Sequence, residues 1–109
     1  MSENSTAVVV GTDEYDIAAA IDEEGFDVSS VDVGNRPGLE EAGIAEAEIY
    51  VLTEVEQATS IVVAKDCNPE LKVVVYSDGS LPDFARGLAD FVLDPDLFET
   101  AAVAEELTP

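Results

Sequence analysis

Short apolar runs recur along the chain and alternate with segments of helical periodicity. The apolar runs cover residues 7–11, 48–52, 71–76 and 91–93, and residues 26–32 alternate apolar and polar side chains. Continuous runs of this length are typical of strands that are buried on both faces of a sheet. Five such strands separated by helices predict a parallel sheet with helices on both faces, a doubly wound, Rossmann-like α/β sandwich of three layers.

The segments between the strands carry helix signals. Residues 13–24 and 39–47 place apolar side chains on one helical stripe, and residues 35–38 predict a turn. Thr53 and Glu56 have the spacing of a capping box, which predicts a helix that starts at Thr53. Ser80 is a candidate cap for a short helix, and Asp94 followed by Pro95 predicts the start of the last helix.

The length of 109 residues supports one domain. We assign it to residues 7–107 and expect residues 1–6 and the last two residues to be frayed. Only residues 33–38 separate the second predicted strand from the next helix, which is too few for a further strand. We therefore expect a sheet of about five strands, with the order 2-1-3-4-5, or 3-2-1-4-5 without its edge strand.

The charge of the chain restricts its partners. There are 25 Asp and Glu against 4 Lys and Arg, a net charge of −21, although 47% of the residues are hydrophobic. Scattered cations do not bind nucleic acid, and an anionic membrane surface repels such a protein. No apolar run approaches the roughly 20 residues of a membrane span, and the first six residues lack the basic region and apolar core that a signal peptide requires. We therefore expect a folded cytoplasmic protein without nucleic-acid binding or membrane insertion.

This acidity has a physical setting. Uncompensated negative charges on a small domain repel one another and oppose compaction, and molar salt screens them within about 3 Å. Abundant Asp and Glu with scarce Lys resemble the cytoplasmic proteins of extreme halophiles. The charge then indicates a cytoplasm of high salt concentration and does not indicate the function, for which the polar side chains are the candidates.

The polar groups that can form a site follow the predicted strands. In doubly wound sheets, ligands bind at the carboxyl edge of the strands, beside the point where strand order reverses. The side chains expected at that edge are those of Thr12, Asp13, Asp32, Thr53, Ser77, Asp78 and Asp94.

Most of the chain resembles the N-terminal, nucleotide-binding domain of the RCK (TrkA-N) family, which regulates potassium channels and transporters. The matching stretches are residues 8–11, 21–28, 31–32, 39–44, 47–53, 56–65, 68–74 and 87–95. The resemblance implies an NAD or adenine-nucleotide ligand, pairing into a homodimer and association with a potassium transport system. The candidate cofactor-binding residues that it implies are Gly11, Thr12, Asp13, Asp32 and Thr53.

The phosphate-binding turn departs from that family. Where the family has Gly-x-Gly-x-x-Gly, only Gly11 remains, and Asp13 and Asp16 stand at the other two glycine positions. These carboxylates repel phosphate and are good helix-start residues, so a structural role is favoured over a ligand role. Asp32 lies 21 residues after Gly11, the spacing at which an acid holds a ribose hydroxyl. We therefore predict no cofactor, and docking of a nucleotide through Asp32 stays an alternative.

The receiver domains of signalling systems are a rival, because they share the five-strand layout. They need an acid pair after the first strand, a phospho-accepting Asp after the third and a Lys after the fifth. Asp13 and Glu14 meet the first requirement, but Thr53 and Asp94 occupy the other two positions. Only a pseudo-receiver without phosphotransfer chemistry is compatible with these residues.

Catalysis and metal binding have weaker signals. The chain has no His and one cysteine, Cys67, for which the neighbouring sequence offers no cation that would activate the thiol. No catalytic residue and no metal ligand is assigned, although a magnesium or potassium site at Asp13, Asp32 and Asp78 stays open. The sequence thus predicts a non-catalytic regulatory or protein-interaction module that pairs with itself or with another protein. The alternatives are a nucleotide sensor linked to potassium transport and a pseudo-receiver.

Overall fold

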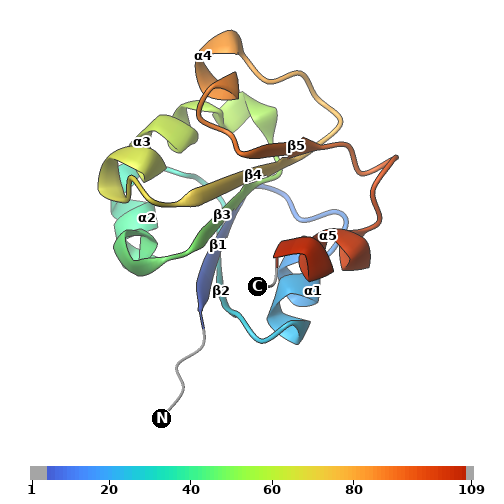
Figure 1. Cartoon of the computed structure of the whole chain (residues 1–109). Coiled ribbons are helices and arrows are strands. Elements are labelled where there is room, and N and C mark those ends of the chain that lie inside the picture. The colour runs from blue at the N-terminus through green and yellow to red at the C-terminus, as the bar shows by residue number, and fades with distance from the viewer. Residues whose placement is uncertain (1–4, 108–109) are drawn as a thin grey trace.

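The protein forms one five-stranded parallel sheet. The computed structural model describes residues 5–107, in which the strands pair in the order β2-β1-β3-β4-β5 (Figure 1). This order confirms the first of the two predicted orders. The strands are β1 (Thr6–Val10), β2 (Asp27–Val31), β3 (Ile49–Leu52), β4 (Lys72–Tyr76) and β5 (Phe91–Leu93).

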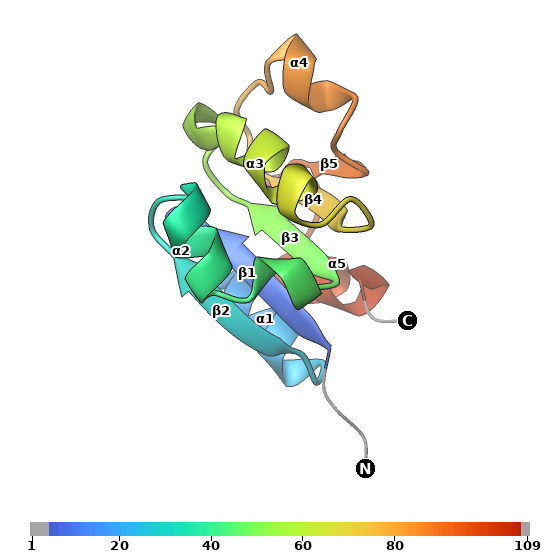
Figure 2. The same ribbon diagram turned by 90° about the vertical axis from the view of Figure 1, so that its left-hand side faces the viewer.

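Helices cover both faces of the sheet, as the doubly wound pattern predicts. Helices α1 (Ile17–Glu23) and α5 (Thr100–Leu107) contact each other on one face. On the other face lie α2 (Arg36–Glu41) and α3 (Thr59–Cys67), which Figure 2 shows in front of the sheet. The short helix α4 (Asp83–Arg86) precedes β5, and two 3₁₀ turns, η1 (Ile44–Glu46) and η2 (Val55–Gln57), flank β3. None of these described helices has the length and apolar character that crossing a bilayer requires.

The central strands are apolar throughout because each buries both of its faces. In β1, Val8 and Val10 belong to the core under α2 and α3, whereas Ala7 and Val9 belong to the core under α1 and α5. All four are at most 1% exposed. A strand that buries only one face would alternate apolar and polar side chains, so the continuous runs reflect this two-sided burial.

The amino-terminal boundary and several helix starts differ from the sequence predictions. Strand β1 begins at Thr6, and the Ser5 carbonyl accepts a hydrogen bond from Asp27 N at 2.8 Å. The frayed ends predicted for residues 1–4 and 108–109 lie outside the described residues. The segment 35–38, predicted as a turn, is the start of α2, because the Asn35 side chain accepts from Gly38 N at 2.9 Å and caps the helix.

Three further helix signals are displaced along the chain. Helix α5 begins at Thr100 and not at Asp94, whose carboxylate accepts from Asp96 N at 2.9 Å and forms a local turn. The capping box is wrong, because the Thr53 hydroxyl donates to the Val10 carbonyl at 3.1 Å, and the α helix begins at Thr59. Ser80 is not the cap of α4, whose N-terminal flank is Pro82.

A buried hydroxyl pair joins β3 to α3. The side-chain oxygens of Tyr50 and Ser60 lie 2.5 Å apart, and Ser60 Oγ also donates to the Gln57 carbonyl at 2.6 Å. Tyr50 is fully buried. Burial raises the pKa of its hydroxyl to about 12, and the hydrogen bond with Ser60 partly opposes that rise.

We expect a Tyr50→Phe variant to lose less stability than the wild type in alkali. As pH rises from about 10 toward about 12, unfolded Tyr50 releases its proton while folded Tyr50 keeps it, so the free energy of unfolding falls. The steepest loss is about 1.4 kcal/mol per pH unit. Urea denaturation of both proteins near pH ~9 and pH ~11 measures the difference. An equal alkaline loss in the two proteins would contradict the assignment.

Candidate functional site

A cavity opens at the carboxyl edge of β1, β3 and β4, where the fold predicts a site. It encloses about 250 Å³ and is lined mainly by polar and acidic groups. Thr12, Thr53 and Ser77 follow the three strands into it, and Glu54 and Asp78 contribute carboxylates. The predicted edge residues thus meet in part, while Asp13, Asp32 and Asp94 do not line this cavity.

The backbone after β1 is already bound by a carboxylate of the same chain. Thr12 N donates to Glu54 Oε1 at 2.8 Å, and the Thr12 hydroxyl lies 3.4 Å from the same oxygen. In a dinucleotide-binding turn, amides of this kind face phosphate. Here an internal anion takes that place, which explains physically why the turn does not need its second and third glycines.

Asp13 starts a helix, as its position in the sequence predicts. Its two carboxylate oxygens accept hydrogen bonds from Ile17 N at 2.7 Å and Ala18 N at 3.2 Å. The backbone reaches α1 through Asp16, which is left-handed with φ of 55°. Helix α1 therefore begins at Ile17, four residues later than predicted, because Asp13 caps it from a distance.

Thr53 closes the gap between β1 and β3. Its backbone N–H and its hydroxyl both donate to the Val10 carbonyl, at 3.0 and 3.1 Å. The side chain is thereby committed to the sheet. It neither caps a helix nor offers a free nucleophile.

Gln57 holds the loop that follows β2. Its amide nitrogen donates to the Asp32 carbonyl at 2.8 Å, and its amide oxygen accepts from Gly34 N at 2.8 Å. The same nitrogen lies 3.3 Å from Glu54 Oε1. The Asp32 backbone is thus fixed by this network, while its side chain lies on the exposed surface.

The proposed metal cluster is not formed. Among residues 5–107, no group of three His, Cys, Asp or Glu side chains is arranged to hold a metal ion. Asp13 uses its oxygens on α1, and Asp32 lies outside the cavity that Asp78 lines. The alternative of a magnesium or potassium site at Asp13, Asp32 and Asp78 therefore has no support.

The cavity is strongly acidic. Glu14, Glu54, Glu56 and Asp78 line it. The pKa of the Tyr15 hydroxyl beside them is raised by desolvation first and then by Asp78, Asp96 and Glu14. This field opposes the entry of phosphate, which carries the same sign of charge.

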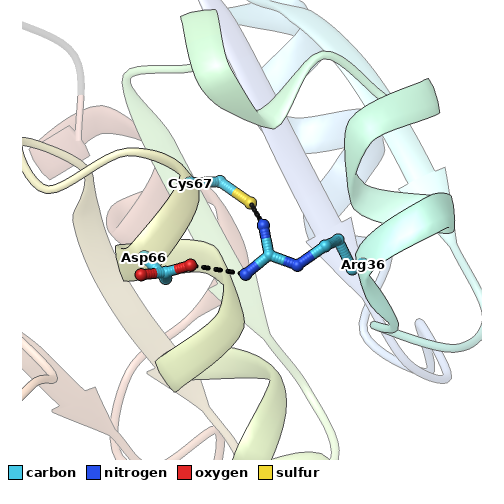
Figure 3. Close-up of polar contacts among 3 residues, drawn as sticks. All are labelled: Arg36, Asp66 and Cys67. Atoms are coloured by element: carbon cyan, nitrogen blue, oxygen red, sulfur yellow. Dashed lines mark hydrogen bonds and ion pairs between the residues drawn. The ribbon is translucent and has the colours of Figure 1, made fainter.

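Cys67 has a cationic neighbour that the sequence did not indicate. Arg36 Nη1 donates to Cys67 Sγ at 3.3 Å, and Arg36 Nη2 pairs with Asp66 at 2.5 Å (Figure 3). The expectation that Cys67 lacks such a neighbour is wrong, because Arg36 comes from α2, 31 residues away. The pKa of the Arg36 guanidinium is raised, chiefly by its hydrogen bond to Asp66. The contact joins α2 to α3 on the face opposite α5.

Sequence reasoning missed Glu54 and Gln57, the two side chains that organise the edge. Glu54 reaches Thr12 across 42 positions, and Gln57 reaches Asp32 across 25. The local signal at residues 53–56 pointed to a capping box with Glu56. Only the pairing of β1 with β3 shows that the neighbouring Glu54 is the residue aimed at the turn.

Replacement of Gly11 by alanine is expected to destabilise the protein more than replacement of Gly25. Both glycines have positive φ, +107° and +99°. A Cβ at Gly11 would lie 2.6 Å from Thr53 Oγ1 and 2.9 Å from Glu54 Cγ, whereas a Cβ at Gly25 meets no atom within 4 Å. Strain alone costs about 1 kcal/mol at Gly25, and we expect more than about 2 kcal/mol at Gly11. Urea denaturation compares the variants, and equal losses would contradict this packing of the edge.

Solved structures of response regulators share this fold. A response regulator from Thermotoga maritima has a TM-score of 0.71 at 16% identity, covering 96% of this chain and 95% of that one. An orphan response regulator of H. pylori has a TM-score of 0.70 at 15% identity, covering 97% and 96%. A response regulator from Burkholderia pseudomallei with a phosphorylated aspartic acid, a calcium ion and citrate has a TM-score of 0.64 at 15% identity, covering 95% and 71%. At these identities the likeness shows the fold alone.

The resemblance to the RCK N-terminal domain is therefore wrong, and the link to potassium transport falls with it. The observed strand order, β2-β1-β3-β4-β5, is the flavodoxin and CheY order. RCK-like and receiver-like chains share the same succession of apolar strands and helices. The pattern along the chain consequently did not separate them, since the order of strands in the sheet is not visible in it.

The family of the chain follows from a match over nearly its whole length. No curated protein sequence matches it. Residues 7–107 match the family of unknown function DUF7126. The chain therefore belongs to DUF7126, a family with no assigned function, and has a receiver-like α/β fold.

Proposed function

We propose that this protein is a non-catalytic, receiver-like signalling module that acts by binding another protein. The observation that carries the proposal is the state of Thr53. It stands after β3, where phosphotransfer requires an aspartate, and its hydroxyl donates to the Val10 carbonyl at 3.1 Å. A neutral hydroxyl that is tied to the backbone cannot replace a carboxylate nucleophile.

The other two requirements for phosphotransfer are also unmet. Of the acid pair after β1, Asp13 spends both oxygens on the first turn of α1. After β5, where a lysine is required, Asp94 accepts from Asp96 N. The acceptor aspartate and the lysine are thus replaced, and Asp13 is committed to the fold. Of the acid pair, only Glu14 lines the cavity.

Nucleotide binding at the same edge has little support. The Thr12 amide, which would face phosphate, is bound by Glu54, and the surrounding cavity is acidic. Outside this cavity, the protein can still bind a partner protein through its exposed surface. A regulatory role through protein association therefore agrees with the geometry better than a ligand-sensing role.

A phosphodonor test checks this proposal. We expect the intact mass of the protein to be unchanged after incubation with acetyl phosphate and Mg²⁺, because no aspartate follows β3. A phosphorylatable response regulator in the same mixture serves as the positive control. A phosphoryl adduct on the wild-type chain would overturn the non-catalytic assignment.

We further propose that the module is adapted to high salt, and expect its melting temperature to rise steeply with KCl. The chain carries a net charge of −21, and its described residues form two ion pairs, Arg36–Asp66 and Arg86–Asp83. Raising KCl from about 0.1 M to about 1 M shortens the screening length from about 10 Å to about 3 Å. Calorimetry in KCl and in an uncharged osmolyte of equal osmolality separates screening from solute exclusion. An unchanged melting temperature in KCl would disprove the adaptation.

A further inference from the structure

Exposed aromatic and aliphatic side chains concentrate in the segment that runs from α4 through β5 to the start of α5. Among residues 5–107, five of the eight exposed large hydrophobic side chains lie between positions 84 and 98. Three are phenylalanines, Phe84, Phe91 and Phe98, with 54%, 46% and 44% of their surface exposed. Phenylalanine is usually buried, so this exposed segment is a candidate interaction surface.

Part of this surface is a groove between β5 and α5. It encloses about 390 Å³ and has almost entirely apolar walls, with Glu106 as the one charged residue in its lining. Phe91 and Leu93 of β5 form one wall, and Val103 and Leu107 of α5 the other. Strand β5 is the last strand in the order, and Figure 1 shows α5 beside α1.

The free edge of β5 can accept another strand. Ser77 N donates to the Leu93 carbonyl at 3.1 Å, so the backbone of Leu93 faces β4. Because successive residues of a strand point their backbone groups to opposite sides, the N–H and C=O of Val92 face away from the sheet. A peptide that lies along this edge can pair with Val92 while its side chain enters the groove.

The groove is held in place by hydrogen bonds to the core. The buried Tyr76 hydroxyl donates to the Phe98 carbonyl at 2.7 Å. The Thr100 hydroxyl donates to the Tyr15 carbonyl at 2.9 Å, which ties the start of α5 to the loop after β1. Phe98, which also lines the groove, is therefore presented from an anchored backbone. Such pre-organisation lowers the entropic cost of binding.

The charge around the groove indicates the occupant. Residues 83–107 carry seven Asp and Glu and a single Arg. A second copy of the chain would bring the same excess of negative charge into the interface. Partly buried charges are screened much less by salt than exposed ones, so like-charge repulsion there costs free energy even in concentrated KCl. A segment with lysines or arginines between apolar residues complements both the groove and its surroundings.

We propose that the groove between β5 and α5 binds an extended, basic and apolar segment of a partner protein, which adds as a strand to β5. The inference rests on the proposed function, since it names the surface through which the module associates. An apolar side chain of the segment fills the groove beside Phe98, and flanking cations face the surrounding carboxylates.

Selection from a displayed library of random short peptides tests this inference on the full chain. We expect wild-type protein to enrich peptides in which lysine or arginine accompanies apolar residues. A selected peptide, synthesised with a fluorophore, then reports affinity by anisotropy. Val92→Pro removes the N–H that faces the free edge, and Phe98→Ser removes the aromatic ring while leaving its anchored carbonyl. We expect each to weaken binding at least about tenfold.

Val33→Ser is the matched control, because Val33 is 59% exposed and lies in the loop after β2, at the other end of the sheet order. It should bind the peptide as the wild type does. Circular dichroism and thermal melting verify that all variants fold. If Val92→Pro does not fold, Phe98→Ser still tests the inference.

Three results would overturn the inference. They are equal affinity in all variants, enrichment of peptides without cations, and a dimer of the chain alone that Phe98→Ser dissociates in sedimentation. The last would make a second copy the occupant. A phosphoryl adduct would instead remove the proposed function and leave the groove measurements untouched, so the two failures are distinguishable.

Discussion

The hydrogen bond between the Glu54 carboxylate and the Thr12 amide is the contact on which the carboxyl edge of the sheet depends. It places a negative charge where a phosphate would otherwise meet the backbone. Gly11 has to remain glycine for this contact, because a Cβ would collide with Thr53 and Glu54. Gly11, which matches the first glycine of a nucleotide-binding turn, is thus required here for packing within the chain.

Other polar side chains at this edge of the sheet are likewise used in hydrogen bonds within the chain. Asp13 caps α1, Thr53 closes β1 onto β3, and Gln57 fixes the loop after β2. These polar groups, which could carry chemistry on this fold, are used in hydrogen bonds within the chain. The surface that we propose for function lies elsewhere, beside the edge strand β5, where the half-exposed Phe91 and Phe98 line an apolar groove in a protein of net charge −21. Under the proposed function, the module acts through a bound partner protein, and shape and charge set its specificity.

The capping box at Thr53 and the resemblance to the RCK family are wrong for the same reason. Both were inferred from patterns of neighbouring residues along the chain. The structure instead relates residues 42 and 43 positions apart, when it joins Thr12 to Glu54 and Val10 to Thr53. No local pattern distinguishes Glu54, which bonds Thr12, from Glu56, which the capping box selected. Likewise, the cation beside Cys67 is Arg36 of α2, and the residues that neighbour Cys67 in sequence do not indicate this contact.

The sequence by itself determined the five strands, their parallel arrangement and the burial of both faces of the sheet. Those features follow from the length and continuity of apolar runs such as Val8–Val10 and Val73–Val75. Each buried position requires an apolar side chain, so the burial of a strand is visible in its own sequence. Only the tertiary structure decided the strand order, the role of Glu54 and the groove beside β5. Each of these depends on which elements become neighbours, and that is a property of the packed chain as a whole.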